Sequence, residues 1–183
     1  MTEPKQALLV IDVQNDFCPG GTLAVPHGDE VIAPLNKLID DFLERGAPVY
    51  KTRDWHPPVT PHFAAHGGTW PVHCVRETEG AEFHPALRDD PRITVISKGV
   101  DEHEGYSAFD HTDLAAQLHK QNVDEIVIGG LATDYCVKSS VLDALKNGFK
   151  VKAIENAMRP VDLQPGDGDR AIDEMRDAGA EVI

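Results

Sequence analysis

The stretch DEIVIGGLATDYCVKSSVLDALKNG, residues 124–148, decides the fold. It opens with an apolar run, EIVIGG, that lacks polar alternation, as expected for a strand buried on both faces. The segment 134–148 has apolar residues at helical spacing and ends at Gly148, a natural helix C-cap. Thr133 or Asp134 could cap this helix, which places Cys136 in its first turn. The stretch therefore predicts a strand followed by a helix, with a cysteine at the junction.

Similar segments occur on both sides of this stretch. Further strands are predicted at 6–13, 47–53, 92–98, 149–156 and 180–183, and further helices at 30–46, 111–122 and 167–180. Strands without alternation that are separated by helices or long connections form a parallel sheet covered on both faces. We therefore predict the α/β class, as a three-layer α/β/α sandwich with a mainly parallel six-stranded sheet.

Length and charge limit the function classes. The chain has 183 residues, which suggests one domain spanning 1–183. The net charge of −14, from 31 acidic and 17 basic residues, argues against a nucleic-acid partner. No apolar run approaches the roughly 20 residues of a membrane span, and the N-terminus lacks signal-peptide features. Three cysteines without a framework pattern favour a reduced, cytoplasmic compartment.

Four chemically active side chains follow the predicted strands. Ligands in parallel α/β folds bind beyond the carboxyl ends of the strands, where this chain places Asp12, Asp54, Lys98 and Cys136. A helix N-terminus stabilises a thiolate and offers amides to an oxyanion, so Cys136 could be a nucleophile. A desolvated Asp12 would have a raised pKa, which suits a proton carrier. Jointly these residues fit nucleophilic catalysis at a carbonyl group.

Each of these residues also has a plainer explanation. Cys136 could be a small buried hydrophobe that packs beside Val137 and Val141, since free cysteines are usually packing residues. Asp12 could cap a turn, and Lys98 could be an ordinary solvated lysine at a strand end. Only their arrival at one rim of the sheet favours catalysis over these alternatives.

The long connection 54–91 is the second candidate for function. It is rich in His, Pro and Gly without a sustained period, and loops of this length are usually functional. Its carboxylate and imidazole groups suit Zn, Fe or Mn. The candidate ligands are Asp54, His56, His62, His66 and His73. A solvated histidine-rich loop is the alternative, but both tryptophans of the chain, Trp55 and Trp70, lie here and suggest a folded cover. Cys74 is interpreted as structural, since neighbours in a strand point to opposite faces.

Four segments in this order resemble a known family. They are LLVIDVQNDFCPGGTLAV (8–25), TRDWHP with GGTWPVHC (52–57 and 67–74), ISKGVDEHEGYSAF (96–109) and GGLATDYCV (129–137). They resemble the isochorismatase-like superfamily of cysteine hydrolases, and within it the nicotinamidase family, over nearly the whole chain. The resemblance implies conversion of nicotinamide to nicotinate and ammonia through a cysteine thioester. It also implies a role in NAD salvage. Finally, it implies one divalent metal ion, zinc before iron or manganese, that orients the pyridine ring.

The resemblance also implies roles for individual residues. The implied catalytic residues are Cys136 as nucleophile, Asp12 as general base and acid, and Lys98 as the third member of the triad. The implied metal ligands are Asp54, His56 and His73, with His62 as an additional ligand found in some members. The implied oxyanion hole consists of the amides of Ala132 and Cys136, after a cis peptide between Leu131 and Ala132. The implied substrate pocket contains Phe17 and Trp70 around the pyridine ring, and Tyr106 beside it.

Departures and alternatives accompany this resemblance. The segment PPVTPHFAAHGG, 57–68, differs from the family's usual pattern of a histidine followed by Ser-Phe, so the fourth metal contact stays open. Another amidase of the superfamily, acting on a carbamoyl or ureido compound, and an isochorismatase are alternatives within enzymes. A non-catalytic metal-binding or redox-sensing protein is the alternative outside them. The expected partner is a small-molecule substrate, and the sequence leaves open whether the chain forms a homo-oligomer.

Overall fold

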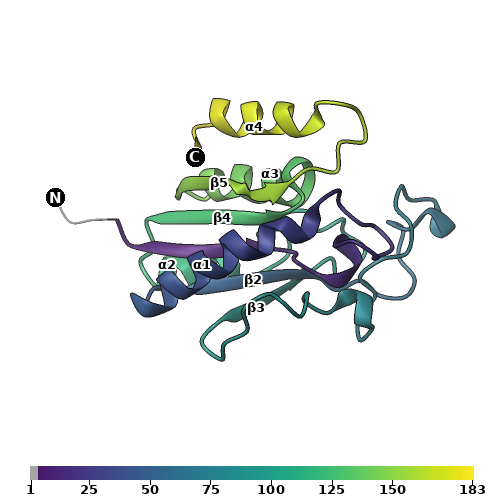
Figure 1. The fold of residues 1–183 in the computed structure, drawn as a ribbon, viewed down its shortest axis with the longest axis horizontal. Coiled ribbons are helices and arrows are strands. Elements are labelled where there is room, and N and C mark those ends of the chain that lie inside the picture. The colour runs from purple at the N-terminus through teal and green to yellow at the C-terminus, as the bar shows by residue number, and fades with distance from the viewer. Residues whose placement is uncertain (1–3) are drawn as a thin grey trace.

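The protein is built on a six-stranded sheet in which every pair of neighbouring strands is parallel (Figure 1). The computed structural model describes residues 4–183, and the strand order is β3-β2-β1-β4-β5-β6. The strands are β1 (Gln6–Ile11), β2 (Val49–Asp54), β3 (Thr94–Lys98), β4 (Glu125–Leu131), β5 (Lys150–Arg159) and β6 (Glu181–Val182). The helices are α1 (Ile32–Glu44), α2 (Leu114–Lys120), α3 (Lys138–Lys146) and α4 (Asp167–Asp177).

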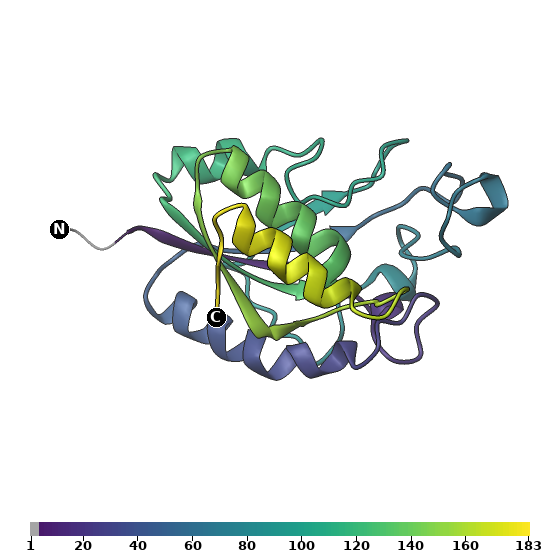
Figure 2. The same cartoon turned by 90° about the horizontal axis from the view of Figure 1, so that it is seen from above.

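Helices cover both faces of the sheet (Figure 2). Leu8 and Val10 of β1 pack in one buried cluster with Leu35 of α1, whereas Leu9 and Ile11 pack in the opposite cluster, which draws on α2, α3 and α4. Successive side chains of a strand point to opposite faces, so an uninterrupted apolar strand serves both clusters. The predicted three-layer α/β/α sandwich is confirmed.

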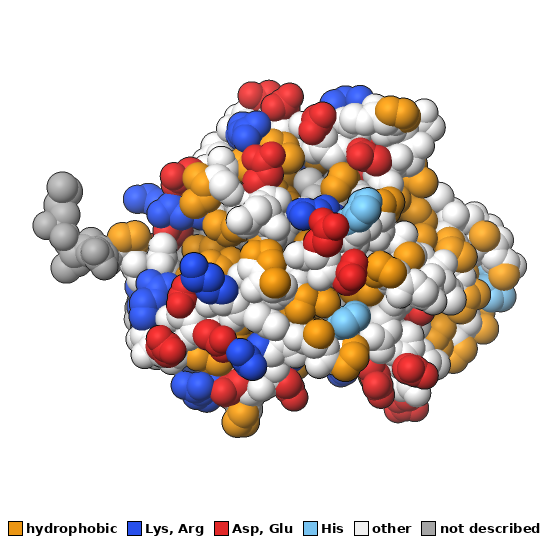
Figure 3. Space-filling view, viewed as in Figure 1, with side chains coloured by type: hydrophobic (Ala, Val, Ile, Leu, Met, Phe, Trp, Pro, Cys, Tyr) orange, Lys and Arg blue, Asp and Glu red, His pale blue; other side chains and the backbone are white. Residues whose placement is uncertain are grey.

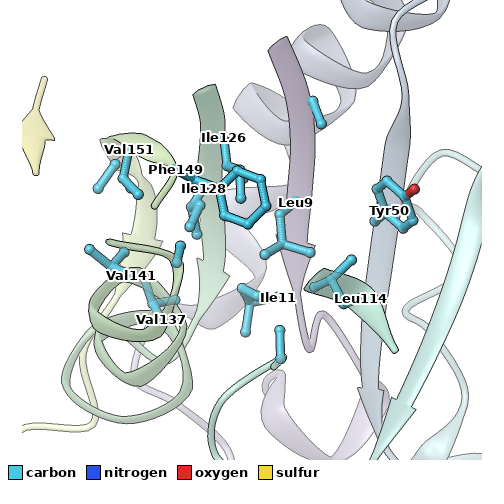
Figure 4. Packing of buried hydrophobic residues seen from close by; sticks show 14 of the residues in the cluster. Leu9, Ile11, Tyr50, Leu114, Ile126, Ile128, Val137, Val141, Phe149 and Val151 are labelled. Atoms are coloured by element: carbon cyan, nitrogen blue, oxygen red, sulfur yellow. The ribbon is translucent and has the colours of Figure 1, made fainter. Parts of the chain in front are cut away.

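The start of α3 is fixed by packing against the sheet. Figure 4 shows Leu9 of β1 and Ile128 of β4 on the face toward Val137 and Val141, and all four side chains are buried in one cluster. Cys136 belongs to the same cluster and is only 6% exposed. The backbone that carries the thiol therefore rests on a well-packed core.

The predicted elements agree with the structure in order and type, but one local prediction is wrong. Neither Thr133 nor Asp134 caps the helix with its side chain; a π-helical turn, Thr133–Val137, precedes α3, and its N-cap residue is Ala132. The carboxylate of Asp134 instead accepts hydrogen bonds from the backbone N–H groups of Val161 and Asp162, at 2.8 and 2.9 Å. Asp134 therefore ties the segment after β5 to the start of α3.

The long connection between β2 and β3 first extends beyond the carboxyl ends of the strands, at the end of the molecule away from the N-terminus (Figures 1 and 2). Its last residues run back beside α1, where Arg88 pairs with Asp40. It contains only short 3-10 turns, at Ala64–His66 and Glu79–Ala81. On the face seen in Figure 3, acidic and basic side chains are interspersed rather than gathered by sign. Within residues 4–183, no helix has the length and apolar character needed to cross a membrane.

Candidate active site

The sheet brings the four strand-end residues together at the point where the strand order reverses. From β1 the chain adds β2 and β3 on one side, and the connection from β3 through α2 then returns to place β4 on the other side of β1, followed by β5 and β6. The pairing of Asp54 with Lys98, and of Ile11 with Gly130, aligns the ends of β1 to β4 on one rim. A Cβ atom on Gly130 would lie 2.1 Å from the carbonyl oxygen of Ile11, so only glycine permits this approach.

Lys98 lies at the centre of the cluster. Its Nζ atom is 2.7 Å from Asp12 Oδ2, 2.6 Å from Asp54 Oδ1 and 3.4 Å from Cys136 Sγ. Its remaining contact is a 2.8 Å hydrogen bond to the carbonyl of Gly105. The side chain of Lys98 is fully buried, so the ammonium is stabilised by these partners and not by water.

Burial and charge set the protonation states at this cluster. Burial alone would lower the pKa of Lys98, but the carboxylates of Asp12 and Asp54 outweigh it and raise that pKa well above its ordinary value. Burial raises the pKa of Asp12, against the opposing effect of Lys98. Burial also raises the pKa of the Cys136 thiol well above its ordinary value. The ammonium is therefore permanent, and Asp12 is the carboxylate better suited to accept a proton.

The two oxygens of Asp12 have different environments. Oδ1 accepts a 2.6 Å hydrogen bond from the hydroxyl of Thr52. Oδ2 is buried beside the ammonium of Lys98 but carries no properly directed hydrogen bond from any residue within 4–183. A carboxylate oxygen of Asp12, one of Asp54 and the sulfur of Cys136 all lie within 4.8 Å of one another. Asp12 therefore has a carboxylate oxygen within 4.8 Å of the thiol sulfur, and its Oδ2 atom is paired with the ammonium of Lys98.

Cys136 lies where backbone amides are exposed at the start of a helix. The π-helical turn begins with a hydrogen bond from Val137 N to Ala132 O, five residues earlier. The amide of Cys136 lies before this donor and so precedes the regular helical hydrogen bonds. The peptide between Leu131 and Ala132 is cis, as expected. Ala132 and Cys136 both line the main cavity of this rim. Their amides are therefore candidates to stabilise an oxyanion.

Asp54, His56 and His73 form a compact ligand set beside this cluster. Their donor atoms lie within 4.8 Å of one another, and the Nε2 atoms of His56 and His73 are 3.4 and 3.8 Å from Asp54 Oδ2. The Nδ1 atoms of the two histidines contact the carbonyl oxygens of Gly99 and Pro71, at 2.9 and 2.7 Å. Since a carbonyl can only accept, each Nδ1 is protonated and each Nε2 presents a lone pair.

The electrostatics of this set also suit a cation. Burial alone would raise the pKa of Asp54, but the ammonium of Lys98 helps to lower it well below its usual range, so Asp54 is anionic. Burial lowers the pKa of His73, which favours the neutral ring. One carboxylate and two neutral imidazoles are typical of zinc, iron and manganese sites. The residues therefore fit a divalent metal ion.

His62 lies beside this set without joining it. Its ring centroid is 5.5 Å from that of His56, and its Nε2 atom is 2.5 Å from the carbonyl oxygen of His103. His66, the remaining candidate, is exposed in the Ala64–His66 turn. Cys74 is fully buried among apolar side chains, in agreement with a structural role, although its φ of 45° shows that it is not in an extended strand.

A small cavity joins the thiol to the ligand set. Phe17, Trp70 and Tyr106, the expected pocket residues, all line it. The indole N–H of Trp70 donates a 2.8 Å hydrogen bond to the hydroxyl of Tyr106, which connects two separate loops. The cavity wall is mostly apolar and aromatic, so it suits a flat ring with one polar substituent.

The structure adds wall residues that the sequence did not indicate. Tyr135 packs edge-on against Trp70, with ring centroids 5.0 Å apart, and lines the cavity. Leu23, Glu104 and Val161 line it as well. Leu23, Glu104 and Tyr135 lie within the segments that resemble the family, but nothing marked them as wall residues. Leu23, Glu104 and Val161 reach the cavity through loops whose course depends on tertiary contacts.

Comparisons with known proteins show the family of this chain. Residues 6–183 match the isochorismatase domain, and the chain belongs to that family. The nicotinamidase of Escherichia coli (strain K12) is 42% identical over 201 residues, which cover 98% of this chain and 94% of that protein. The pyrazinamidase of Pyrococcus horikoshii, solved in complex with zinc, superposes with a TM-score of 0.93 at 43% identity, covering 98% and 99% of the two chains. PnC1 from L. infantum, solved in complex with nicotinate, gives a TM-score of 0.90 at 34% identity, covering 98% and 92%.

Proposed function

We propose that this member of the isochorismatase family hydrolyses nicotinamide to nicotinate and ammonia, as its nicotinamidase relatives are named for doing. One observation carries the proposal: Cys136 and the ligand set of Asp54, His56 and His73 line one aromatic cavity, and the buried carboxylate of Asp12 lies within 4.8 Å of the thiol sulfur. A carboxamide at the thiol and a ring nitrogen at the ligand set would use both ends of that cavity.

Asp54, His56 and His73 would hold one divalent ion, for which zinc is the first candidate and iron or manganese the alternatives. When bound, the ion would take the pyridine nitrogen as a ligand and so orient the ring. His62 is proposed as an additional ligand: its Nε2 atom contacts the His103 carbonyl, so Nδ1 is the nitrogen that would be available for coordination.

The covalent chemistry would be carried by Cys136 and Asp12. Asp12 Oδ2 takes the thiol proton as Sγ attacks the carboxamide carbon, and the amides of Ala132 and Cys136 stabilise the oxyanion. Asp12 then returns the proton to the amino group, and ammonia leaves as the thioester forms. A water molecule, deprotonated by Asp12, hydrolyses the thioester to nicotinate and restores the thiol. Each oxyanion donor is expected to contribute about 3 kcal/mol to the barrier reduction.

Lys98 would assist the proton transfer between Cys136 and Asp12. Its ammonium stabilises Asp12 and the developing thiolate together, because Nζ contacts both residues. The bond from Nζ to the Gly105 carbonyl fixes the ammonium in place. Burial raises the pKa of the Cys136 thiol, but the ammonium of Lys98 opposes that rise, so Asp12 can take the thiol proton when a substrate is bound.

Another amidase activity of the family, on a carbamoyl or ureido compound, is the second candidate. Such substrates lack a ring nitrogen, so they would leave the Asp54, His56 and His73 set without a role. The aromatic walls from Phe17 and Trp70 also favour a planar ring over an open-chain compound. Nicotinamide therefore accounts for more of the cavity.

The test is ammonia release from nicotinamide, pyrazinamide and open-chain amides, paired with metal analysis of the same preparation. We expect the two aromatic amides to be preferred, and Cys136→Ala to abolish turnover while nicotinamide still binds. Preference for an open-chain carbamoyl compound would reject the substrate proposal, and substantial turnover by Cys136→Ala would reject the covalent mechanism.

Two wider statements belong to this proposal. Production of nicotinate would place the protein in NAD salvage. The three cysteines are all free thiols in the structure, which supports the expectation of a reducing, cytoplasmic compartment.

A further inference from the structure

A second group of possible metal ligands lies on the loop that follows β3. Asp101, His103 and His111 place their donor atoms within 4.8 Å of one another, and all three residues are exposed. The Nδ1 atoms of His103 and His111 are 3.0 and 3.6 Å from the two carboxylate oxygens of Asp101. These residues share no member with the Asp54, His56 and His73 set.

Backbone geometry holds the three side chains together. Asp101 Oδ1 also accepts a 2.8 Å hydrogen bond from the backbone N–H of His103, which turns the chain back on itself. His111 adopts a φ of 52°, a left-handed conformation that is uncommon for residues other than glycine. The two imidazole rings stack with centroids 3.5 Å apart beside the carboxylate. Ligands eight and ten residues apart in the chain are thus presented as one group.

We propose that Asp101, His103 and His111 form a second site for a divalent transition-metal ion, which water completes on the exposed side. Two imidazoles and one carboxylate match the preferences of zinc and nickel. The rings must separate for both to coordinate one ion, and exposed side chains change rotamer within nanoseconds. This site is independent of the proposed hydrolysis and would bind more weakly than the buried set.

An ion at this site would restrict the movement of the loop 101–111 beside the active site. The same loop presents the carbonyl of His103 to His62 and the carbonyl of Gly105 to Lys98. It also supplies Glu104 and Tyr106 to the cavity wall. Bridging residues 101 and 111 would therefore restrict the backbone between them, from which four active-site contacts arise.

The experiment starts from protein that carries one equivalent of zinc and adds further zinc in equilibrium dialysis, with metal and protein measured together. We expect a second equivalent to bind to the wild-type protein. His111→Asn should weaken that second step at least about tenfold, because it removes a ligand. Asparagine tolerates the left-handed backbone, so this variant retains the turn. His103→Gln is the second variant, since it keeps the backbone carbonyl that contacts His62.

His27→Asn is the matched control. His27 is also exposed, has a φ of 56° and lies 3.2 Å from a carboxylate oxygen of Glu30, but it belongs to neither ligand group. It should bind the second equivalent as the wild-type protein does. Hydrogen exchange should slow in residues 101–111 when the second equivalent binds to the wild-type protein and to His27→Asn.

The wild-type protein also gives an answer that does not depend on any variant. In its NMR spectrum the ring signals of His103 and His111 should move with the second equivalent, and those of the other exposed histidines should not. Stoichiometry that stops at one ion, movement of other histidine signals instead, or full second-site binding by folded His111→Asn and His103→Gln would each overturn the proposal.

Discussion

The side-chain amide of Gln14 forms hydrogen bonds with both backbone groups of Asp54. Gln14 Oε1 accepts from Asp54 N, and Gln14 Nε2 donates to Asp54 O, each at 2.8 Å. Nε2 also donates to the carbonyl of Ala81 at 2.9 Å, and Gln14 is completely buried. Gln14 lies two residues after Asp12. Its side chain therefore connects the segment that carries Asp12 with the metal-ligand candidate Asp54 and with the loop at Ala81.

Replacement of Gln14 by Met should loosen this link at nearly constant volume. It leaves Asp54 N–H, Asp54 O and Ala81 O buried without partners, at about 1–3 kcal/mol for each group. We expect the free energy of unfolding to fall by at least about 2 kcal/mol and the metal content per chain to fall with it. Denaturant unfolding and metal analysis measure the two effects. Gln117→Met on α2 is the control, since it loses only a 2.9 Å bond to Asp113. It should change neither the free energy of unfolding nor the metal content.

The sequence allowed prediction of residues that follow from strand topology. Asp12 directly follows β1, and Asp54 and Lys98 are the last residues of β2 and β3. Neighbouring parallel strands bring these ends together, so the proximity of the three residues could be expected. Gln14 could not be identified in this way, since its partners lie 40 and 67 residues away and are backbone groups. The prediction that Asp134 could cap the helix was wrong for a related reason. A local cap and a distant backbone partner compete for one carboxylate, and in the structure the carboxylate of Asp134 accepts its hydrogen bond from the distant Val161 N–H.

The bond between Trp70 and Tyr106 should contribute to substrate binding more than to chemistry. The residues come from different loops and are joined by the 2.8 Å Nε1-to-hydroxyl bond. Trp70→Phe and Tyr106→Phe should each raise KM for nicotinamide several-fold, with little change in kcat. If the bond acts as inferred, a double-mutant cycle on kcat/KM should give a coupling of about 0.5–1.5 kcal/mol.

Tyr50→Phe is the matched control for that cycle. The Tyr50 hydroxyl accepts a 2.6 Å bond from Gln121, away from the cavity, so its loss should leave KM unchanged. Strict additivity of Trp70→Phe and Tyr106→Phe would show that the two loops contact the substrate independently.

Cys18 should make the protein less stable at alkaline pH. Burial, with a smaller effect of Asp29, raises the pKa of the Cys18 thiol to about 11, from an ordinary value of 9.0. The folded protein therefore retains the thiol while the unfolded chain ionises. No cost arises below about pH 9, and the cost grows between pH 9 and 11 to roughly 2–3 kcal/mol for a two-unit shift.

Comparison of the wild-type protein with Cys18→Ala isolates this contribution from other alkaline titrations. The variant loses packing at every pH, but its unfolding free energy should fall less steeply from pH 9 to 11. Asp29→Asn should give an intermediate slope, because only the charge term is removed. Parallel curves for the wild-type protein and Cys18→Ala would mean that Cys18 does not titrate with the folded state.

Removal of a single ligand atom from His73 should separate metal binding from nucleophilic chemistry. Asparagine can reproduce the Nδ1 donor that contacts Pro71 O at 2.7 Å, but it has no counterpart of Nε2, which faces Asp54. His73→Asn should therefore keep the loop in place while the metal content per chain falls and KM for nicotinamide rises at least about tenfold, as expected when a metal site is weakened. The Cys136 thiol should remain available to a small alkylating reagent, since the hydrogen bond to its sulfur comes from Lys98 and not from His73. His66→Asn, in the same loop but exposed and outside both ligand groups, should leave metal content and KM as they were. A full complement of metal in His73→Asn, measured on protein whose unfolding matches the wild type, would remove His73 from the ligand set and leave the orientation of the pyridine ring to the aromatic walls alone.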